Sequence, residues 1–348
     1  MKLATLFALS LALLPLHASA EAGAAPVRRV PLIYCTDLFH PHEDPDDHFD
    51  LATVYSIPEF DLRGIVLDQG ARQRLQPGRI PVSQLNHLSG RSIPVFEGLA
   101  TPLVSSGDTG TNQPAEFQGG VRFILDTLRA ATGRVDFIAV GSVRDLCAAF
   151  NRDPDLFRQR AGRVMIFIGE ASHPDVREYN VGLDPHAFVG LMRSGLNLCW
   201  VPCFDGGLWR NNGHASFWRA THADLLSAAP PELIQFFIYA LEKETGDPIE
   251  FLRQPVDPKR REALFRHTRN LWCTAIFRGL LVEGAPAGDA FVFDPVDVTI
   301  RDDAAVRYGP GPDAKSVLRF RVRDQARYDA DMTAATAAIL ARFPVAPR

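Results

Sequence analysis

The chain has 348 residues, and its 41 acidic and 37 basic side chains give a formal net charge of −4. This mild acidity argues against a nucleic-acid polymer as partner, because phosphate backbones attract basic proteins. Hydrophobic residues make up 46% of the chain, which is enough for a sizeable core. No segment after residue 20 is apolar enough to cross a membrane.

The first 20 residues have the pattern of a secretory signal. Lys2 supplies the positive start, residues 3–16 are apolar, and an A-x-A cleavage site follows at 18–20. The apolar run is broken by Pro15 and His17, so it is too short for a membrane span. We therefore expect an exported protein, periplasmic or secreted, whose mature part is a single domain over residues 21–348.

Short apolar runs alternate with amphipathic segments in most of the mature chain. This alternation predicts an α/β fold with a mostly parallel central sheet and helices on both faces. The expected strands are 30–34, 60–67, 93–97, 135–140, 163–168, 196–201, 291–300 and 316–322. The expected helices are 48–56, 81–89, 120–131, 144–152, 185–194 and 328–343, with further helices dominating 217–280.

Carboxylates gather where the first expected strand ends. Asp37 comes first, and four more follow closely: Glu43, Asp44, Asp46 and Asp47. In open α/β sheets, ligands bind beyond the carboxyl ends of the strands. Carboxylates this close stay ionised together only if water, hydrogen bonds or a cation offset their repulsion, and Ca²⁺ tolerates the irregular geometry of such a loop. The simpler alternative is a solvated acidic turn that caps the next helix.

Three other segments lie at or near the ends of expected strands. Gly141 and Ser142 form a turn that could aim main-chain carbonyls at a cation. Glu178 and Asn180 would project to one side of an extended segment and could bind sugar hydroxyls, or they could simply cap the next helix. A Gly-rich loop at 204–218 suits a ring-bearing ligand, or alternatively buried packing, through Trp209, Asn211, Asn212, His214 and Trp218.

The five cysteines are an odd number, so at least one thiol stays free or pairs outside the chain. Cys35, Cys147 and Cys199 lie in apolar segments and are expected to be small buried hydrophobic residues. Cys199 and Cys203 are close in the chain and could form a thiol pair or, in an exported protein, a disulfide.

Taken in order, these segments resemble the inosine–uridine-preferring nucleoside hydrolases over about residues 30–343. The strand-loop-helix opening of that family is matched by Asp37 with Asp46 and Asp47. Further matching segments are 93–103, 135–146, 163–169, Glu178-Tyr179-Asn180 and Asp184-Pro185.

The resemblance implies cleavage of the N-glycosidic bond of a ribonucleoside by a water bound to Ca²⁺. Asp37 and Asp47 would bind the calcium, together with the main-chain carbonyl of Arg144 and the side chain of Asn270. Asp37 would also take the proton from the attacking water. Ribose hydroxyls would be held by three side chains: Asp46, Glu178 and Asn180.

Other residues are candidates to contact the leaving base. Trp209, Asn212 and His214 are candidates to bind the substrate. His267 and His214 are candidates to donate a proton to the base, although each could equally be an ordinary surface or packing histidine.

Several residues depart from the family pattern. Cys35 stands in place of the first aspartate, and extra residues separate Asp37 from Asp46, so Asp44 rivals Asp37 as the base. Asn270 replaces a distal aspartate and removes one negative charge. Two alternatives stay open: a glycosidase or sugar-modifying enzyme on the same scaffold, and a sugar- or nucleoside-binding protein without turnover. Family members are often dimers or tetramers, so a homo-oligomer is a further expectation.

Overall fold

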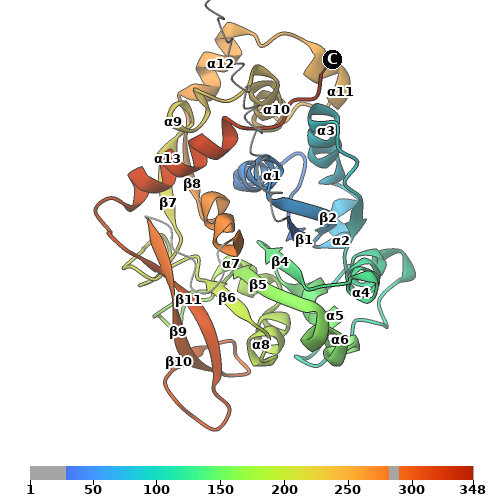
Figure 1. The fold of residues 1–348 in the computed structure, drawn as a ribbon, viewed down its shortest axis with the longest axis vertical. Coiled ribbons are helices and arrows are strands. Elements are labelled where there is room, and N and C mark those ends of the chain that lie inside the picture. Colours follow the sequence, from blue (N-terminus) through green and yellow to red (C-terminus); the bar gives the residue numbers. More distant parts are fainter. Residues whose placement is uncertain (1–28, 282–289, 348) are drawn as a thin grey trace, which may run out of the picture.

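The computed structural model describes residues 29–281 and 290–347, so the expected secretory signal lies outside the described residues. One sheet of nine strands runs through this part of the chain (Figure 1). Its strands are β1 Val30–Thr36, β2 Phe60–Leu67, β3 Val95–Glu97, β4 Val135–Ala139, β5 Ala161–Phe167, β6 Leu198–Val201, β9 Phe291–Ile300, β10 Val306–Tyr308 and β11 Lys315–Val322. A separate two-stranded sheet consists of β7 Trp218–Thr221 and β8 Thr268–Leu271.

Helices cover both faces of the large sheet. They are α1 Asp46–Ser56, α2 Gly70–Gln73, α3 Arg79–Ser89, α4 Gly119–Ala130, α5 Arg144–Arg152, α6 Pro154–Arg160, α7 Tyr179–Leu183, α8 Pro185–Arg193, α9 His222–Leu226, α10 Pro231–Leu241, α11 Pro248–Arg253, α12 Pro258–Phe265 and α13 Tyr328–Leu340. Two 3₁₀ helices span Ala115–Phe117 and Thr274–Leu281. None of the helices in the described ranges is long and apolar enough to span a bilayer.

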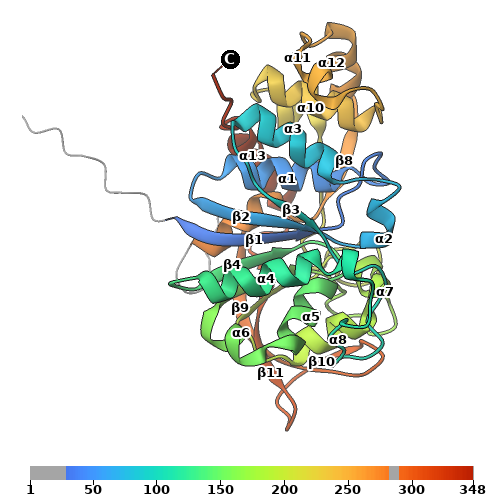
Figure 2. The same ribbon diagram turned by 90° about the vertical axis from the view of Figure 1, so that its right-hand side faces the viewer.

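Two hydrophobic cores hold the layers together. One joins the sheet to α1, α3, α10 and α13, and the other joins it to α4, α5, α6 and α8. Figure 2 shows these helices on opposite sides of the strands. Along β1, Leu32 and Tyr34 belong to the first core, whereas Ile33 and Cys35 belong to the second. This alternation follows from the two-residue period of a strand.

The order of the strands is β10-β9-β11-β6-β5-β4-β1-β2-β3. β1 pairs in parallel with β2 on one side and with β4 on the other. The parallel pairing continues through β5, β6 and β11, and β9 is antiparallel to both β10 and β11. The chain therefore reverses its direction of travel across the sheet between β1 and β4. Such a reversal opens a crevice beyond the carboxyl ends of the two strands, where ligands bind.

The predicted α/β class with a mostly parallel sheet is confirmed, and β2 and α5 have the predicted bounds. The sequence analysis missed the antiparallel pair of β7 and β8 within the segment expected to be helical. The segment after Glu178 is not extended, because residues 179–183 form the short helix α7, which Glu178 caps.

All five cysteines are buried and free, so the disulfide alternative for Cys199 and Cys203 is wrong. Cys199 lies within β6, and Cys203 follows the strand with its main-chain N–H donating to the Gly169 carbonyl at 2.8 Å. The extended backbone between them carries the two thiols apart.

Candidate active site

A cavity of about 580 Å³ lies beyond the carboxyl ends of the central strands. Asp37, Val140 and Cys203, which follow β1, β4 and β6, contribute to its wall, as does Phe167 at the end of β5. Seven carboxylates line it: Asp37, Glu43, Asp44, Asp46, Asp47, Asp50 and Glu178. Asp37, Asp46 and Asp47 therefore face a ligand-sized space, whereas Glu43 and Asp44 at its rim are exposed to solvent.

Asp37 and Asp47 occupy adjoining parts of this cavity. Asp37 is 9% exposed, and Asp47 in the first turn of α1 accepts a hydrogen bond from the Thr36 hydroxyl at 3.0 Å. Burial raises the pKa of Asp37 to about 8, with the Asp68 carboxylate adding to the shift. Burial also raises the pKa of Asp47, and the negative charges of Asp37 and Asp46 raise it further. These carboxyl groups thus lack enough positive charge nearby to stay ionised together.

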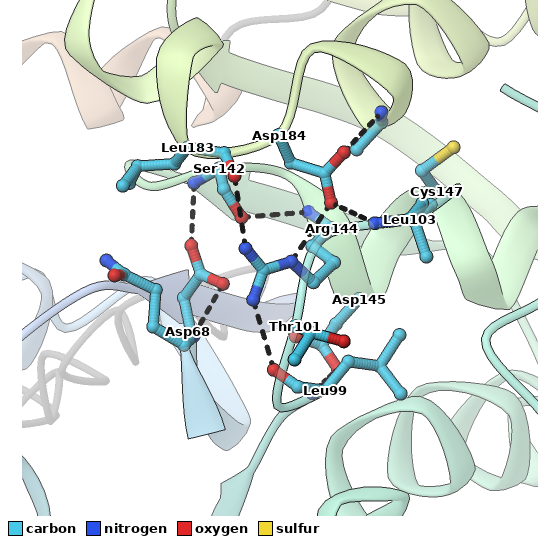
Figure 3. Close-up of polar contacts among 12 residues, drawn as sticks. Asp68, Leu99, Thr101, Leu103, Ser142, Arg144, Asp145, Cys147, Leu183 and Asp184 are labelled. Carbon is cyan, nitrogen blue, oxygen red and sulfur yellow. Dashed lines mark hydrogen bonds and ion pairs between the residues drawn. The ribbon is translucent and has the colours of Figure 1, made fainter. Parts of the chain in front are cut away.

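Gly141 lets two of the carboxylates approach the end of β4. A Cβ on Gly141 would lie 2.8 Å from Asp68 Oδ2 and 3.2 Å from Asp37 Oδ1. Asp68, which follows β2, accepts main-chain hydrogen bonds at 2.7 Å from both Gln69 and Ser142 (Figure 3). The sequence analysis assigned no role to Asp68, whereas the structure places it behind Asp37 as a positioning group.

Glu178 and Asn180 approach the cavity from the start of α7. The Glu178 carboxylate accepts main-chain hydrogen bonds from Gly169 at 2.8 Å, Asn180 at 2.9 Å and Val181 at 3.2 Å. The Asn180 amide nitrogen donates to the Val140 carbonyl at 3.1 Å, which leaves its side-chain oxygen for a ligand. Glu178 caps α7 and also lines the cavity, whereas Asp184 caps the next helix, α8.

An aromatic wall closes another side of the cavity. Phe204, Trp209 and Trp272 line it, and the ring centroid of Trp272 lies 5.9 Å from Phe204 and 6.0 Å from Trp209. Trp209 is 57% exposed and has a φ of 64°, in the left-handed region that a bulky residue rarely adopts. The predicted substrate-binding residue Trp209 is therefore presented at the mouth by a strained turn.

The loop between Asp37 and α1 is held by side chains of α2 and the residues after it. Gln73 and Gln76 donate to the main-chain carbonyls of Leu38 and Pro41 at 3.1 and 2.8 Å. Arg72 forms an ion pair with Glu43, and its guanidinium lies 4.1 Å from the centroid of the Phe39 ring.

Five predicted site residues do not line the cavity: Arg144, Asn212, His214, His267 and Asn270. The Arg144 guanidinium forms a buried ion pair with Asp184 at 3.0 Å and donates to the Leu99 and Leu183 carbonyls, so it joins α5 to α8 (Figure 3). The guanidinium is thus structural, and the role of the Arg144 main-chain carbonyl as a calcium ligand stays a prediction.

The other four are occupied elsewhere. Asn212 packs against Gly206 in its own turn, and the His214 ring nitrogen lies 3.2 Å from the Asp205 carboxylate. The Asn270 side-chain oxygen accepts a hydrogen bond from Arg219 across β7 and β8 at 2.9 Å. His267 is exposed after α12, with its main-chain carbonyl bound by the His222 N–H at 2.9 Å.

Trp272 and Cys273 take the place that the sequence gave to Asn270. Both line the cavity at the start of the 3₁₀ helix Thr274–Leu281. Asp50 reaches the same region, and it accepts a main-chain hydrogen bond from Thr274 at 3.0 Å. Asp50 was missed, although it stands four residues after Asp46 on α1 and so shares its face. The thiol of Cys273 was also missed, and no acidic pattern could have shown it.

The chemistry of these donors suits a hard cation better than a soft one. Asp37, Asp46 and Asp47 offer carboxylate oxygens in a space with unbalanced negative charge, and oxygen ligands are what Ca²⁺ prefers. Within residues 29–281 and 290–347, however, no three acidic, histidine or cysteine side chains converge on one point as metal ligands do. Of the predicted calcium ligands, Asp37 and Asp47 line this space.

Comparisons with known proteins show the family of the chain. A sequence profile described as inosine-uridine preferring nucleoside hydrolase matches residues 40–247. An uncharacterised protein of Schizosaccharomyces pombe is 27% identical over 186 residues, which is 45% of this chain and 57% of that protein. The pyrimidine-specific ribonucleoside hydrolase RihB of Escherichia coli O157:H7 is 25% identical over 171 residues, 44% of this chain and 54% of its own. The chain thus spans little more than half the length of these relatives.

A solved structure extends the likeness over more of the fold. A plant nucleoside hydrolase, PpNRh1, superposes with a TM-score of 0.57 at 16% identity, covering 90% of this chain and 100% of that chain. At this identity the superposition supports the shared fold alone. Since the family profile covers more than half of the sequence, the chain belongs to the inosine-uridine preferring nucleoside hydrolase family.

Proposed function

We propose that this protein hydrolyses the N-glycosidic bond of a ribonucleoside or a related N-riboside. The observation that carries the proposal is the meeting of Asp37, Asp46 and Asp47 with Glu178 and Asn180 around one cavity, in a chain that belongs to a nucleoside hydrolase family. Groups that can bind a sugar diol and a group that can take a proton from water therefore face the same space.

Asp37 is the base in this proposal. It would accept the proton of the attacking water, and Asp46 and the side-chain oxygen of Asn180 would hold the ribose hydroxyls. As the nucleobase departs, the sugar gains positive charge, which the surrounding carboxylates stabilise. The pKa of Asp37, about 8 when no cation offsets its neighbours, means that Asp37 needs such an offset to be ionised at neutral pH.

We further propose that Ca²⁺ supplies this offset, bound by Asp37 and Asp47. When present, the ion would lower the pKa of a bound water and leave Asp37 as an ionised acceptor for its proton. We also propose that the protein is exported through its N-terminal signal and that residues 21–348 form one domain. The related Escherichia coli protein is named for pyrimidine ribonucleosides, and that substrate class belongs in the test set.

The direct experiment is to incubate the protein and Asp37→Asn with a nucleoside panel, in the presence of calcium, and to measure reducing sugar. We expect release by the natural chain and a loss of at least roughly 10²-fold in Asp37→Asn. Asp126→Asn, at an exposed carboxylate of α4, is the matched control and should keep full activity. Binding of ribose without release from any nucleoside would instead support the non-catalytic alternative.

A further inference from the structure

The charges around the cavity are strongly unequal. Seven carboxylates line it, against the guanidinium groups of Arg72 and Arg177. At the rim, Glu43 is paired with Arg72, and Asp44 is paired with Arg269 at 3.0 Å. In the part of the chain that the structure describes, the five inner carboxylates have no ion pair with lysine or arginine: Asp37, Asp46, Asp47, Asp50 and Glu178.

A divalent cation on Asp37 and Asp47 would not remove this excess. Asp46, Asp50 and Glu178 would still face the ligand, and a neutral nucleoside carries no charge to balance them. A positively charged ligand would balance these carboxylates, because opposite charges attract strongly in a partly desolvated space. The inner cavity is therefore complementary in charge to a positively charged ligand as well as to a metal ion.

The aromatic wall suits the same kind of ligand. Trp209 and Trp272 present two indole rings to the cavity, and the centroid of the Phe204 ring lies 5.5 Å from that of Trp209 and 5.9 Å from that of Trp272. Tryptophan is the aromatic side chain that attracts cations best, through the negative face of its ring. A flat, positively charged ring would combine stacking with cation–π attraction at this wall.

A histidine proton donor is missing from the wall. No histidine in residues 29–281 or 290–347 lines the cavity. The two candidates from the sequence lie outside it, since His214 is bound to Asp205 and His267 is exposed after α12. A neutral nucleobase leaves as an anion unless it is protonated, whereas a ring whose glycosidic nitrogen is already positive leaves as a neutral molecule.

We propose that the preferred substrate class is an N-ribosyl pyridinium, a riboside whose glycosidic nitrogen carries a fixed positive charge. This inference rests on the hydrolase function proposed above. The C1′–N bond breaks with its electron pair going to the ring nitrogen, which makes the pyridine neutral. The water oxygen bonds to C1′, and its proton passes to Asp37. The products are ribose and a neutral pyridine, and no acid has to act on the leaving group.

The test compares kcat/KM for nicotinamide riboside with kcat/KM for uridine and inosine, using the full protein with added calcium. We expect at least a tenfold preference for the charged riboside. Trp209→Leu should lower this preference roughly 2- to 30-fold, the range of one cation–π contact, and Trp209→Phe should lower it less because it keeps a ring. Equal kcat/KM values for charged and neutral ribosides would overturn the inference and leave the hydrolase proposal standing.

A binding measurement separates the two proposals. Quenching of tryptophan fluorescence is titrated with 1-methylnicotinamide, which is a cation, and with nicotinamide, which is neutral and has the same ring. Tighter binding of the cation, weakened in Trp209→Leu, supports the cation-selective cavity. If this preference occurs while no riboside is hydrolysed, the hydrolase function is refuted and cation recognition is retained. Equal binding of the two probes refutes the inference whatever the activity.

Discussion

Gly141→Ala would place a methyl group between Asp37, which lines the cavity, and Asp68, which lies behind it. The new Cβ would lie 2.8 Å from Asp68 Oδ2, a contact shorter than real Cβ atoms show, and 3.2 Å from Asp37 Oδ1. Asp68 has little freedom to retreat, because its oxygens accept hydrogen bonds at 2.7 Å from the main chains of Gln69 and Ser142. Either those bonds break or Asp37 moves.

The expected effect on stability is the difference of two terms. Overpacking of this kind lowers the free energy of unfolding by about 1–3 kcal/mol. Alanine in place of glycine also restricts the unfolded chain, which raises the free energy of unfolding by about 0.4–1 kcal/mol. A net loss of about 1–2 kcal/mol remains for Gly141→Ala. If Asp37 moves by an ångström or so, kcat/KM should also fall by roughly 10²-fold.

Gly133→Ala is the matched control, because nothing lies within 4 Å of a Cβ at that position. Urea unfolding followed by tryptophan fluorescence measures the free energy of unfolding, and nucleoside hydrolysis measures kcat/KM. The steric reasoning is refuted if Gly141→Ala matches Gly133→Ala in both assays. A loss of stability with full activity would mean that Asp68 yields and Asp37 stays in place.

Three further predictions concern the frame of the site. Arg144→Met should lower the free energy of unfolding by about 3–5 kcal/mol, because it leaves Asp184 buried without its partner. Urea unfolding should show most of that loss restored in a variant that also carries Asp184→Leu. Burial lowers the pKa of His222 to about 3 in the folded protein. Below about pH 6.5 the unfolded chain therefore binds a proton that the folded protein does not bind, so the free energy of unfolding should fall as the pH drops, less steeply in His222→Gln. Identical slopes of unfolding free energy against pH in the two proteins would contradict this. Calcium at 100 times its Kd should add about 2.7 kcal/mol of stability, and a thermal shift that survives in Asp47→Asn would place the ion elsewhere.

The sequence was most informative where a periodic pattern reflects local physics. Apolar runs predicted the strands, and the placing of Asp37 after the first strand predicted a site at the edge of the sheet, because parallel strands end on one side. Asp50 was recoverable in principle from its spacing to Asp46 along α1.

The remainder of the wall depends on contacts between distant segments. Trp272 and Cys273 reach the cavity because the chain returns after β8, more than 200 residues from Asp37 in the sequence. Asn270, two positions earlier, lies opposite Arg219 in the pairing of β7 with β8, and the register of such a short pair is not visible in the sequence. A shift of two residues therefore decided which side chain entered the site.

The loop from Leu38 to Pro45 has a consequence for how this protein can diversify. Arg72, Gln73 and Gln76 hold this loop from α2 and the turn after it. Arg269 of β8 and the Glu244 carbonyl hold it at Asp44 and His40, so these contacts all come from outside the large sheet. The entrance to the cavity can therefore change in length or composition while β1 and β4 keep Asp37 and Gly141 in register. The residues that select the ligand and the residues that carry out the reaction thus lie in separate parts of the chain. Each part can evolve while the other is kept.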